Sequence, residues 1–212
     1  MFDCDGTLTD GQAGVVAAMD AAFAAIDATP PPHGEVRRIV GLSLPQAIRR
    51  LAPSLTDDDQ RCVVDAYKAA FRASREDGSL REPLYPGMAD LLRALHAQGW
   101  LLAVATGKSD RGLAATLAAH DLHGLFTALH TADRHPSKPH PAMLEAAIAD
   151  AGARRQDTAM IGDTVYDMQM AGAAGVRGIG VDWGYHEGEE LRAAGAIGVA
   201  QDAAALQAMI DG

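Results

Sequence analysis

Cysteine is scarce in this chain, and long apolar runs are absent. Cys4 and Cys62 are the only two cysteines among 212 residues, too few for a disulfide framework and typical of the reducing cytoplasm. No run of about 18 apolar residues occurs, so no membrane-spanning helix is expected. The start of the chain also lacks the basic and apolar regions of a secretory signal. We therefore predict a cytoplasmic protein without a membrane partner.

Positive charge is scarce as well. Lys and Arg number 18 against 28 Asp and Glu, which gives a formal net charge of −10 at pH 7. No block of basic residues occurs, so a nucleic-acid partner is not expected, because binding to a phosphate backbone depends on clustered Lys and Arg. Such a chain can bind an anion only where local cations or a metal ion reverse the field.

Apolar periodicity divides the chain into two regions. Residues 13–79 carry only helical patterns, the clearest over residues 13–27. From residue 80 onward, predicted helices alternate with short apolar runs at 101–105, 126–130, 158–162 and 178–182. This alternation predicts an α/β fold, a Rossmann-like parallel sheet with helices on both faces. We expect residues 1–12 and 80–212 to form this core and residues 13–79 to form an all-helical unit.

Ligands of such sheets bind beyond the carboxyl ends of the strands, and the first of these ends carries two acids. In Asp3-Cys4-Asp5-Gly6-Thr7, the two carboxylates share a side if the segment is extended. Such a pair can bind a metal ion, divide nucleophile and acid/base roles, or form a plain acidic turn. It is not an EF-hand loop, because Leu8 and Gly14 stand where that loop needs Gly and Glu.

The second strand end carries Thr106-Gly107-Lys108-Ser109. It is not a nucleotide-binding P-loop, because Leu102 stands where that motif needs Gly. A hydroxyl and an amide remain at the start of a helix, which suits an anion site or a simple helix N-cap.

The third strand is followed by a proline-rich loop that contains Lys138. On its own, a lysine in such a loop is expected to be solvated. His135 and His140, in the same loop, lack the spacing of a metal site, so surface positions are expected for them.

The fourth strand end carries Asp163 and Asp167, four residues apart and near the positive end of a predicted helix. A capping role explains one of them, but not both together with Asp3 and Asp5. Four carboxylates in one crevice would repel one another and would reject a phosphate dianion. A Mg²⁺ ion held by Asp3 and Asp163, aided by Lys138, removes both conflicts.

Taken together, these residues resemble the haloacid dehalogenase superfamily, and the chain looks like a phosphatase of its phosphoglycolate-phosphatase-like branch. The resemblance spans almost the whole chain: DxDGT at 3–7, Thr106, Lys138, and GDxxxD at 162–167. The helical insert after the first motif is similar to the cap domain of this branch. The resemblance implies a Mg²⁺-dependent phosphatase that hydrolyses a small phosphomonoester, phosphoglycolate-like or a sugar phosphate, through an aspartyl-phosphate.

The resemblance also implies roles for the acidic residues. Asp3 would be the nucleophile, and Asp5 would protonate the leaving alkoxide and then deprotonate the hydrolytic water. Asp3, the backbone carbonyl of Asp5, and Asp163 would coordinate Mg²⁺. Asp167 would orient Lys138 or a metal-bound water.

Other groups would hold the substrate. Thr106, the Gly107 amide and Lys138 would bind the phosphoryl oxygens. The cap loop Gly41-Leu42-Ser43-Leu44 would close over the leaving group. Members of the family usually have several apolar residues before the first Asp. Only Met1 and Phe2 precede it here. We therefore expect a short and weakly stabilised first strand, of the kind that a truncated start would leave.

Alternatives stay open within the superfamily. Dehalogenase members generally lack the second aspartate, which is present as Asp5, and sugar-phosphate mutases carry a His where Val15 stands. A non-catalytic member that binds a phosphorylated ligand is a further alternative, and so is a structural metal module, although the latter leaves Thr106 and Lys138 without a role. Four cations either meet a second anionic group of the substrate or lie in solvent: Arg49, Arg50, Lys108 and Arg111. The substrate and the oligomeric state stay open.

Overall fold

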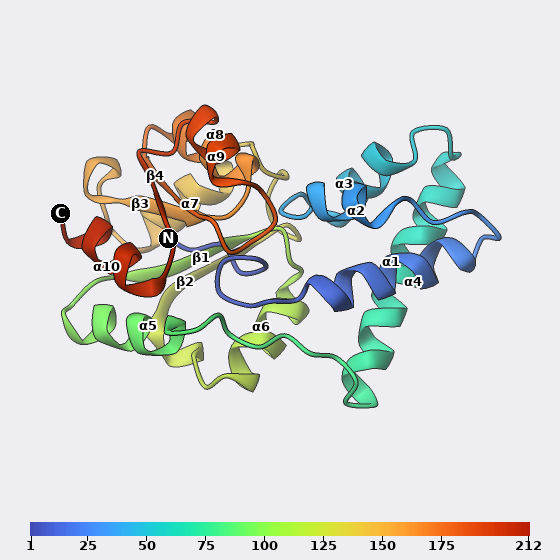
Figure 1. The fold of residues 1–212 in the computed structure, drawn as a ribbon, viewed down its shortest axis with the longest axis horizontal. Coiled ribbons are helices and arrows are strands. Elements are labelled where there is room, and N and C mark those ends of the chain that lie inside the picture. Colours follow the sequence, from blue (N-terminus) through green and yellow to red (C-terminus); the bar gives the residue numbers. More distant parts are fainter.

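The computed structural model describes residues 1–212, and a parallel β-sheet forms the centre of its larger region (Figure 1). β1 (Leu102–Thr106) pairs with β2 (Phe126–Thr131). β3 (Ala159–Gly162) pairs with β4 (Arg177–Val181), which pairs with β5 (Gly198–Ala200). All of these pairings are parallel, as the alternating sequence pattern predicted.

The segment at the start of the chain joins the two parts of the sheet. Phe2 forms a parallel bridge to Val104 of β1 on one side and to Ile161 of β3 on the other. Its N–H donates to the carbonyl of Ala103 at 2.8 Å, and the N–H of Asp3 donates to that of Ile161 at 2.9 Å. The spatial order is therefore β2-β1-Phe2-β3-β4-β5, and the predicted first strand consists of a single bridging residue.

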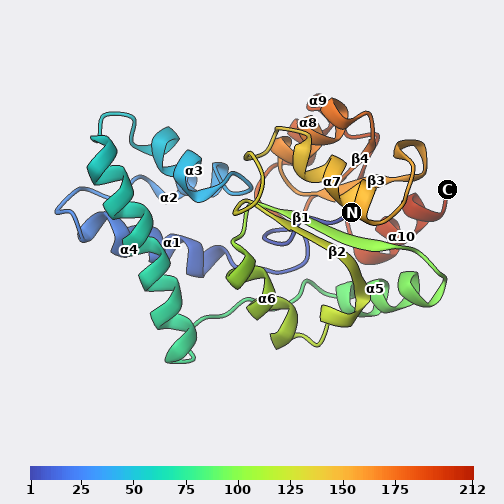
Figure 2. The ribbon, with the colours of Figure 1, turned by 180° about the vertical axis from the view of Figure 1, so that it is seen from behind.

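Helices cover both faces of this sheet (Figures 1 and 2). α7 (Ala142–Asp150) and α8 (Val165–Ala174) pack on one face, and α5 (Met88–Ala97), α6 (Asp110–Ala119) and α10 (Ala203–Asp211) on the other. Successive strand side chains point to opposite faces. Ala103 and Ala105 therefore join the apolar cluster beneath α7 and α8, whereas Leu102 and Val104 join the cluster beneath α5.

Four helices lie beside the sheet and form the smaller region (Figure 1). They are α1 (Gln12–Ala24), α2 (His33–Arg38), α3 (Leu44–Leu51) and α4 (Asp57–Glu76). Their apolar side chains form a separate cluster that includes Met19, Phe23, Ile48 and Val63. This agrees with the predicted all-helical segment, although α2, which begins after three prolines, was not predicted.

Five elements of the core were not predicted from the sequence. Three of them, α9 (Gly188–Ala193), β5 and α10, lie in the last part of the chain, and two short 3₁₀ turns, η1 (His123–Leu125) and η2 (Arg155–Asp157), precede β2 and β3. No helix of the structure combines the length and the apolar character needed to cross a membrane.

Phe2 should be important for stability because its side chain is almost fully buried within the apolar cluster on one face of the sheet. We expect Phe2→Ala to lower the free energy of unfolding by about 3–5 kcal/mol, the usual cost of removing a buried Phe side chain. Urea denaturation followed by tryptophan fluorescence measures this loss. Leu101→Ala is the control, because Leu101 is 52% exposed; an equal loss for both variants would contradict the proposed role of Phe2.

Candidate active site

The structure brings three of the predicted acidic residues, Asp3, Asp163 and Asp167, together with Lys138 at the carboxyl edge of the sheet. The Lys138 ammonium nitrogen lies 3.0 Å from Asp3 Oδ2 and 2.6 Å from Asp167 Oδ1. Asp3, Asp163 and Asp167 each place a carboxylate oxygen within 4.8 Å of the other two. All four side chains are buried.

Lys138 is not the solvated loop residue that its local sequence suggests. Its side chain is fully buried between two carboxylates. Burial lowers the pKa of this amine, but Asp167 and Asp3 outweigh burial and raise the pKa above its ordinary value. Lys138 is therefore a permanent positive charge inside an acidic cluster.

Asp167 contacts Lys138 and also helps to cap the first turn of α8. Thr164 is the N-cap of α8, and its hydroxyl donates to Asp167 Oδ2 at 2.6 Å. The Thr164 N–H donates to the same oxygen at 3.1 Å, which completes a capping box. The other oxygen of Asp167 accepts from Lys138. One carboxylate thus fixes both the helix start and the lysine.

Asp163 is held by the turn that follows Asp5. The Thr7 hydroxyl donates to Asp163 Oδ1 at 2.7 Å, and the N–H of Tyr185 donates to Oδ2 at 2.9 Å. Gly6 has φ +85°, and a Cβ there would overlap the Asp163 carboxylate. Glycine in the DxDGT motif is therefore required twice, by the backbone conformation and by the close approach.

Three carboxylates share a single ammonium group in this cluster, so negative charge is in excess. Burial raises the pKa of Asp163 well above its ordinary value, and the neighbouring Asp3 and Asp167 add to the effect. Burial also raises the pKa of Asp3, and its Oδ2 is buried without accepting a well-directed hydrogen bond. Oxygen ligands of this kind suit a hard divalent cation such as Mg²⁺. The Asp5 carboxylate lies outside this group.

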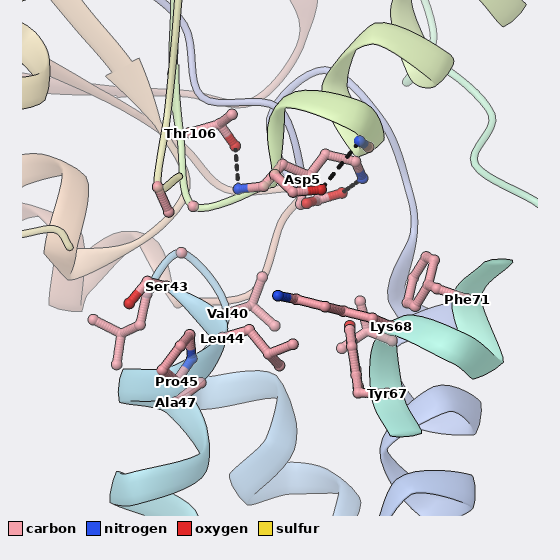
Figure 3. A pocket seen from close by; sticks show the side chains of 18 of the residues that line it. Asp5, Val40, Ser43, Leu44, Pro45, Ala47, Tyr67, Lys68, Phe71 and Thr106 are labelled. Atoms are coloured by element: carbon pink, nitrogen blue, oxygen red, sulfur yellow. Dashed lines mark hydrogen bonds and ion pairs between the residues drawn. The ribbon is translucent and has the colours of Figure 1, made fainter. Parts of the chain in front are cut away.

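Asp5 instead forms an ion pair that sequence reasoning missed (Figure 3). Its Oδ1 accepts from the Lys108 ammonium group at 2.5 Å, and Lys108 also donates to Glu82 Oε1 at 2.7 Å. Lys108 is thus largely buried rather than free to meet a substrate anion. Glu82 lies in no recognised motif, and only the charge balance of the folded site reveals it.

The predicted cap loop lies on the second motif of the core. A Cβ at Gly107 would lie 2.7 Å from the backbone carbonyl oxygens of both Gly41 and Leu42. The N–H of Ser43 donates to the Ser137 hydroxyl, in the Lys138 loop, at 2.8 Å. The loop of residues 41–44 therefore approaches the core beside Thr106, whose side chain is buried.

A cavity of about 420 Å³ lies between the helical region and the core. Asp3, Asp5 and Thr106 line its core side. The helical side is mostly apolar, and Figure 3 shows the Lys68 ammonium group of α4 pointing into the space. Its apolar and aromatic lining includes Val15, Met19, Val40, Leu44, Tyr67 and Phe71.

Only some of the other basic and histidine positions meet their expectations. Arg111 lines the cavity, whereas Arg49 and Arg50 do not. His140 is exposed as expected, but His135 is only half-exposed, because its Nε2 lies 2.8 Å from Nδ1 of the buried His130. The expectation of surface positions therefore holds for His140 and only in part for His135.

Comparison with known proteins agrees with this geometry. The model of the haloacid dehalogenase-like hydrolase family matches residues 1–181, so the chain belongs to this family, as its motifs predicted. It is 38% identical over 199 residues to "Probable phosphatase IndB" of Dickeya dadantii, covering 92% of this chain and 85% of that protein. It is 31% identical over 198 residues to a phosphoglycolate phosphatase of Pseudomonas fluorescens, covering 90% and 71%.

The solved structures confirm the fold class. A crystal structure of a hydrolase from Pseudomonas syringae matches with a TM-score of 0.88 at 27% identity, covering 99% of this chain and 96% of the other. The prediction of a hydrolase of this superfamily is confirmed, and the names of the relatives agree with the predicted class of phosphoric monoester hydrolases.

Mg²⁺ should stabilise the folded protein, because the carboxylate cluster exists only in the folded state. At a concentration 100 times its dissociation constant, a ligand adds about 2.7 kcal/mol. We expect a corresponding rise in the thermal unfolding midpoint, and Asp163→Asn should lose most of it. Asp182→Asn, which changes an exposed carboxylate just after β4, should keep the full rise. An undiminished rise in Asp163→Asn would exclude this cluster as the Mg²⁺ site.

Proposed function

We propose that the protein is a Mg²⁺-dependent phosphatase that hydrolyses a small phosphomonoester through an aspartyl-phosphate on Asp3. The observation that carries this proposal is the buried Asp3 carboxylate, which lies beside Lys138 and faces two further carboxylates. The family membership and the names of the relatives support phosphoric monoester hydrolysis. The cytoplasmic location stays a prediction from the two cysteines.

Asp3 is suited to act as the nucleophile. Its Oδ1 accepts from the N–H of Cys4 at 2.6 Å, which orients the carboxylate, while Oδ2 lacks a well-directed donor. Asp3, Asp163 and the backbone carbonyl of Asp5 would hold Mg²⁺, which neutralises negative charge on the phosphoryl group. Lys138, Thr106 and the Gly107 amide would hold the phosphoryl oxygens. Positioning and electrostatic stabilisation of this kind dominate phosphoryl transfer.

Asp5 is suited to the acid/base role. Burial raises the pKa of its carboxyl group above the ordinary value, although Lys108 opposes this rise. A raised pKa favours a carboxyl group that can give a proton to the leaving alkoxide and later take one from water. Asp5 also lines the cavity where the leaving group would lie.

The mutase alternative is disfavoured by the cavity lining. Val15, which stands where mutases of the family carry a His, is one of the lining residues. An apolar side chain cannot supply the hydrogen bond or the proton that an imidazole would. Release of inorganic phosphate, without isomerisation of a sugar phosphate, is the expected reaction.

We propose that residues 13–79 act as a cap and that residues 1–12 and 80–212 act as the catalytic core. The cap loop at Gly41, Leu42 and Ser43 would shield the reacting phosphoryl group from water. The cavity of about 420 Å³ has room for more than a two-carbon leaving group. The apolar wall of the cavity and the Lys68 ammonium group suit a leaving alcohol that has an apolar part and an anionic group.

Asp5→Asn tests the acid/base assignment because it leaves the nucleophile and the metal carboxylates in place. Hydrolysis of an alkyl phosphate should fall by about 10²–10⁴-fold, the usual contribution of an acid/base group. An aryl phosphate, whose leaving group needs no proton, should still give a burst and leave phosphate on Asp3. Rapid-quench kinetics and intact-protein mass spectrometry measure the two effects. Wild-type turnover of the alkyl phosphate by the variant would refute the assignment.

Lys68→Met tests the recognition of the leaving group. Phosphoglycolate, with its carboxylate, should lose about tenfold in kcat/KM, within the range for one charge-assisted hydrogen bond. Ethyl phosphate has no such group and should change less than about twofold. Lys68→Arg, which keeps the charge, should retain most of the preference. Equal losses on both esters would show that Lys68 does not read an anionic group.

A further inference from the structure

Asp5 shares its only cationic partner with a second carboxylate. Lys108 lies 2.5 Å from Asp5 Oδ1 and 2.7 Å from Glu82 Oε1. The side chains of Lys108, Glu82 and Asp5 are only 10%, 9% and 17% exposed. The three charges therefore interact largely out of water, where the loss of one partner is costly.

Glu82 is itself fixed from several directions. It lies in the segment between α4 and α5, where the chain returns from the helical region to the core. Its Oε2 lies 3.4 Å from a guanidinium nitrogen of Arg75, at the end of α4, and 3.3 Å from the Thr116 hydroxyl of α6. Its backbone carbonyl lies 2.7 Å from Nε2 of His120. Glu82 thus stays in place whatever Asp5 does.

This arrangement solves a problem that the acid/base role creates. To reach the oxygen of a leaving group, the Asp5 carboxyl group must loosen its contact with Lys108. If Asp5 were the only partner, that movement would leave a buried cation without a counter-charge, which is strongly unfavourable. With Glu82 present, Lys108 keeps one carboxylate partner throughout, so the movement of Asp5 is much less costly.

We propose that Glu82 is a positioning residue for Asp5: it retains Lys108 in a permanent ion pair and so lets Asp5 exchange between Lys108 and the leaving group. The inference rests on the acid/base role proposed for Asp5. In Glu82→Gln, Lys108 would hold Asp5 as its sole charged partner. The step that needs Asp5 to protonate the leaving group should then slow, whereas attack by Asp3 should not.

The test compares two substrates in the full-length protein with Mg²⁺. We expect Glu82→Gln to lower kcat/KM for ethyl phosphate by about 10–100-fold, a sizeable part of an acid/base contribution. The same variant should change kcat/KM for 4-nitrophenyl phosphate less than about threefold. Glu82→Asp, which keeps the charge, should recover part of the alkyl activity. Glu76→Gln makes the same change of charge at an exposed position of α4 and should alter neither substrate.

A double variant separates the ion-pair role from a general loss of structure. In Lys108→Met the cation is absent, so a further Glu82→Gln change should not alter the ratio of alkyl to aryl activity. This arm also serves if Glu82→Gln alone fails to fold, because the double variant removes the ammonium group together with one of its two carboxylate partners. Equal losses on both substrates in Glu82→Gln, no loss at all, or a further fall of the ratio in the Lys108→Met background would each overturn the inference. If the wild type hydrolyses neither ester, the proposed function fails instead.

Discussion

The balance between buried carboxylates and one buried ammonium group governs the structure of this site. Asp3, Asp163 and Asp167 each place a carboxylate oxygen within 4.8 Å of the other two, and only Lys138 among the side chains brings positive charge to them. Negative charges of this kind, taken out of water, persist only when donors or cations compensate them. The fold supplies backbone and hydroxyl donors, and a divalent cation is the natural remaining partner.

Many local features of the core serve this balance. The left-handed Gly6 lets the turn after Asp5 approach Asp163, and the Thr7 hydroxyl then donates to that carboxylate. Thr164 caps α8 and donates to Asp167, so the helix start and the site share one arrangement of hydrogen bonds. The strand ends bring these groups together because Phe2 joins β1 to β3 in a single sheet.

The sequence was informative wherever a function depends on short motifs. The DxDGT and GDxxxD motifs placed Asp3 and Asp163 correctly, because parallel strand ends meet at one edge of the sheet, whatever the connecting helices do. The sequence was uninformative where contacts between distant segments decide whether a side chain is buried and which partner it has. Lys138 looks like a solvated loop residue until the loop is packed against α8, and the partnership of Lys108 with Glu82 joins segments that no pattern links. β5 is three residues long and carries too few side chains to show a period.

The two cations at the carboxyl edge have different environments, and this difference matters for the chemistry. Lys138 is fixed between Asp3, the proposed nucleophile, and Asp167, where a constant charge would favour binding of a phosphoryl group. Lys108 is shared between Asp5, which would change partners in the proposed reaction, and Glu82, which would not. A group that moves a proton needs alternative partners of similar strength, because a single strong ion pair would hold it in one state. The core therefore pairs a rigid cation with the proposed nucleophile and a shared cation with the proposed acid/base group. Because Glu82 also faces Arg75 of α4, the shared cation lies beside one of the two chain segments that connect the helical region to the core.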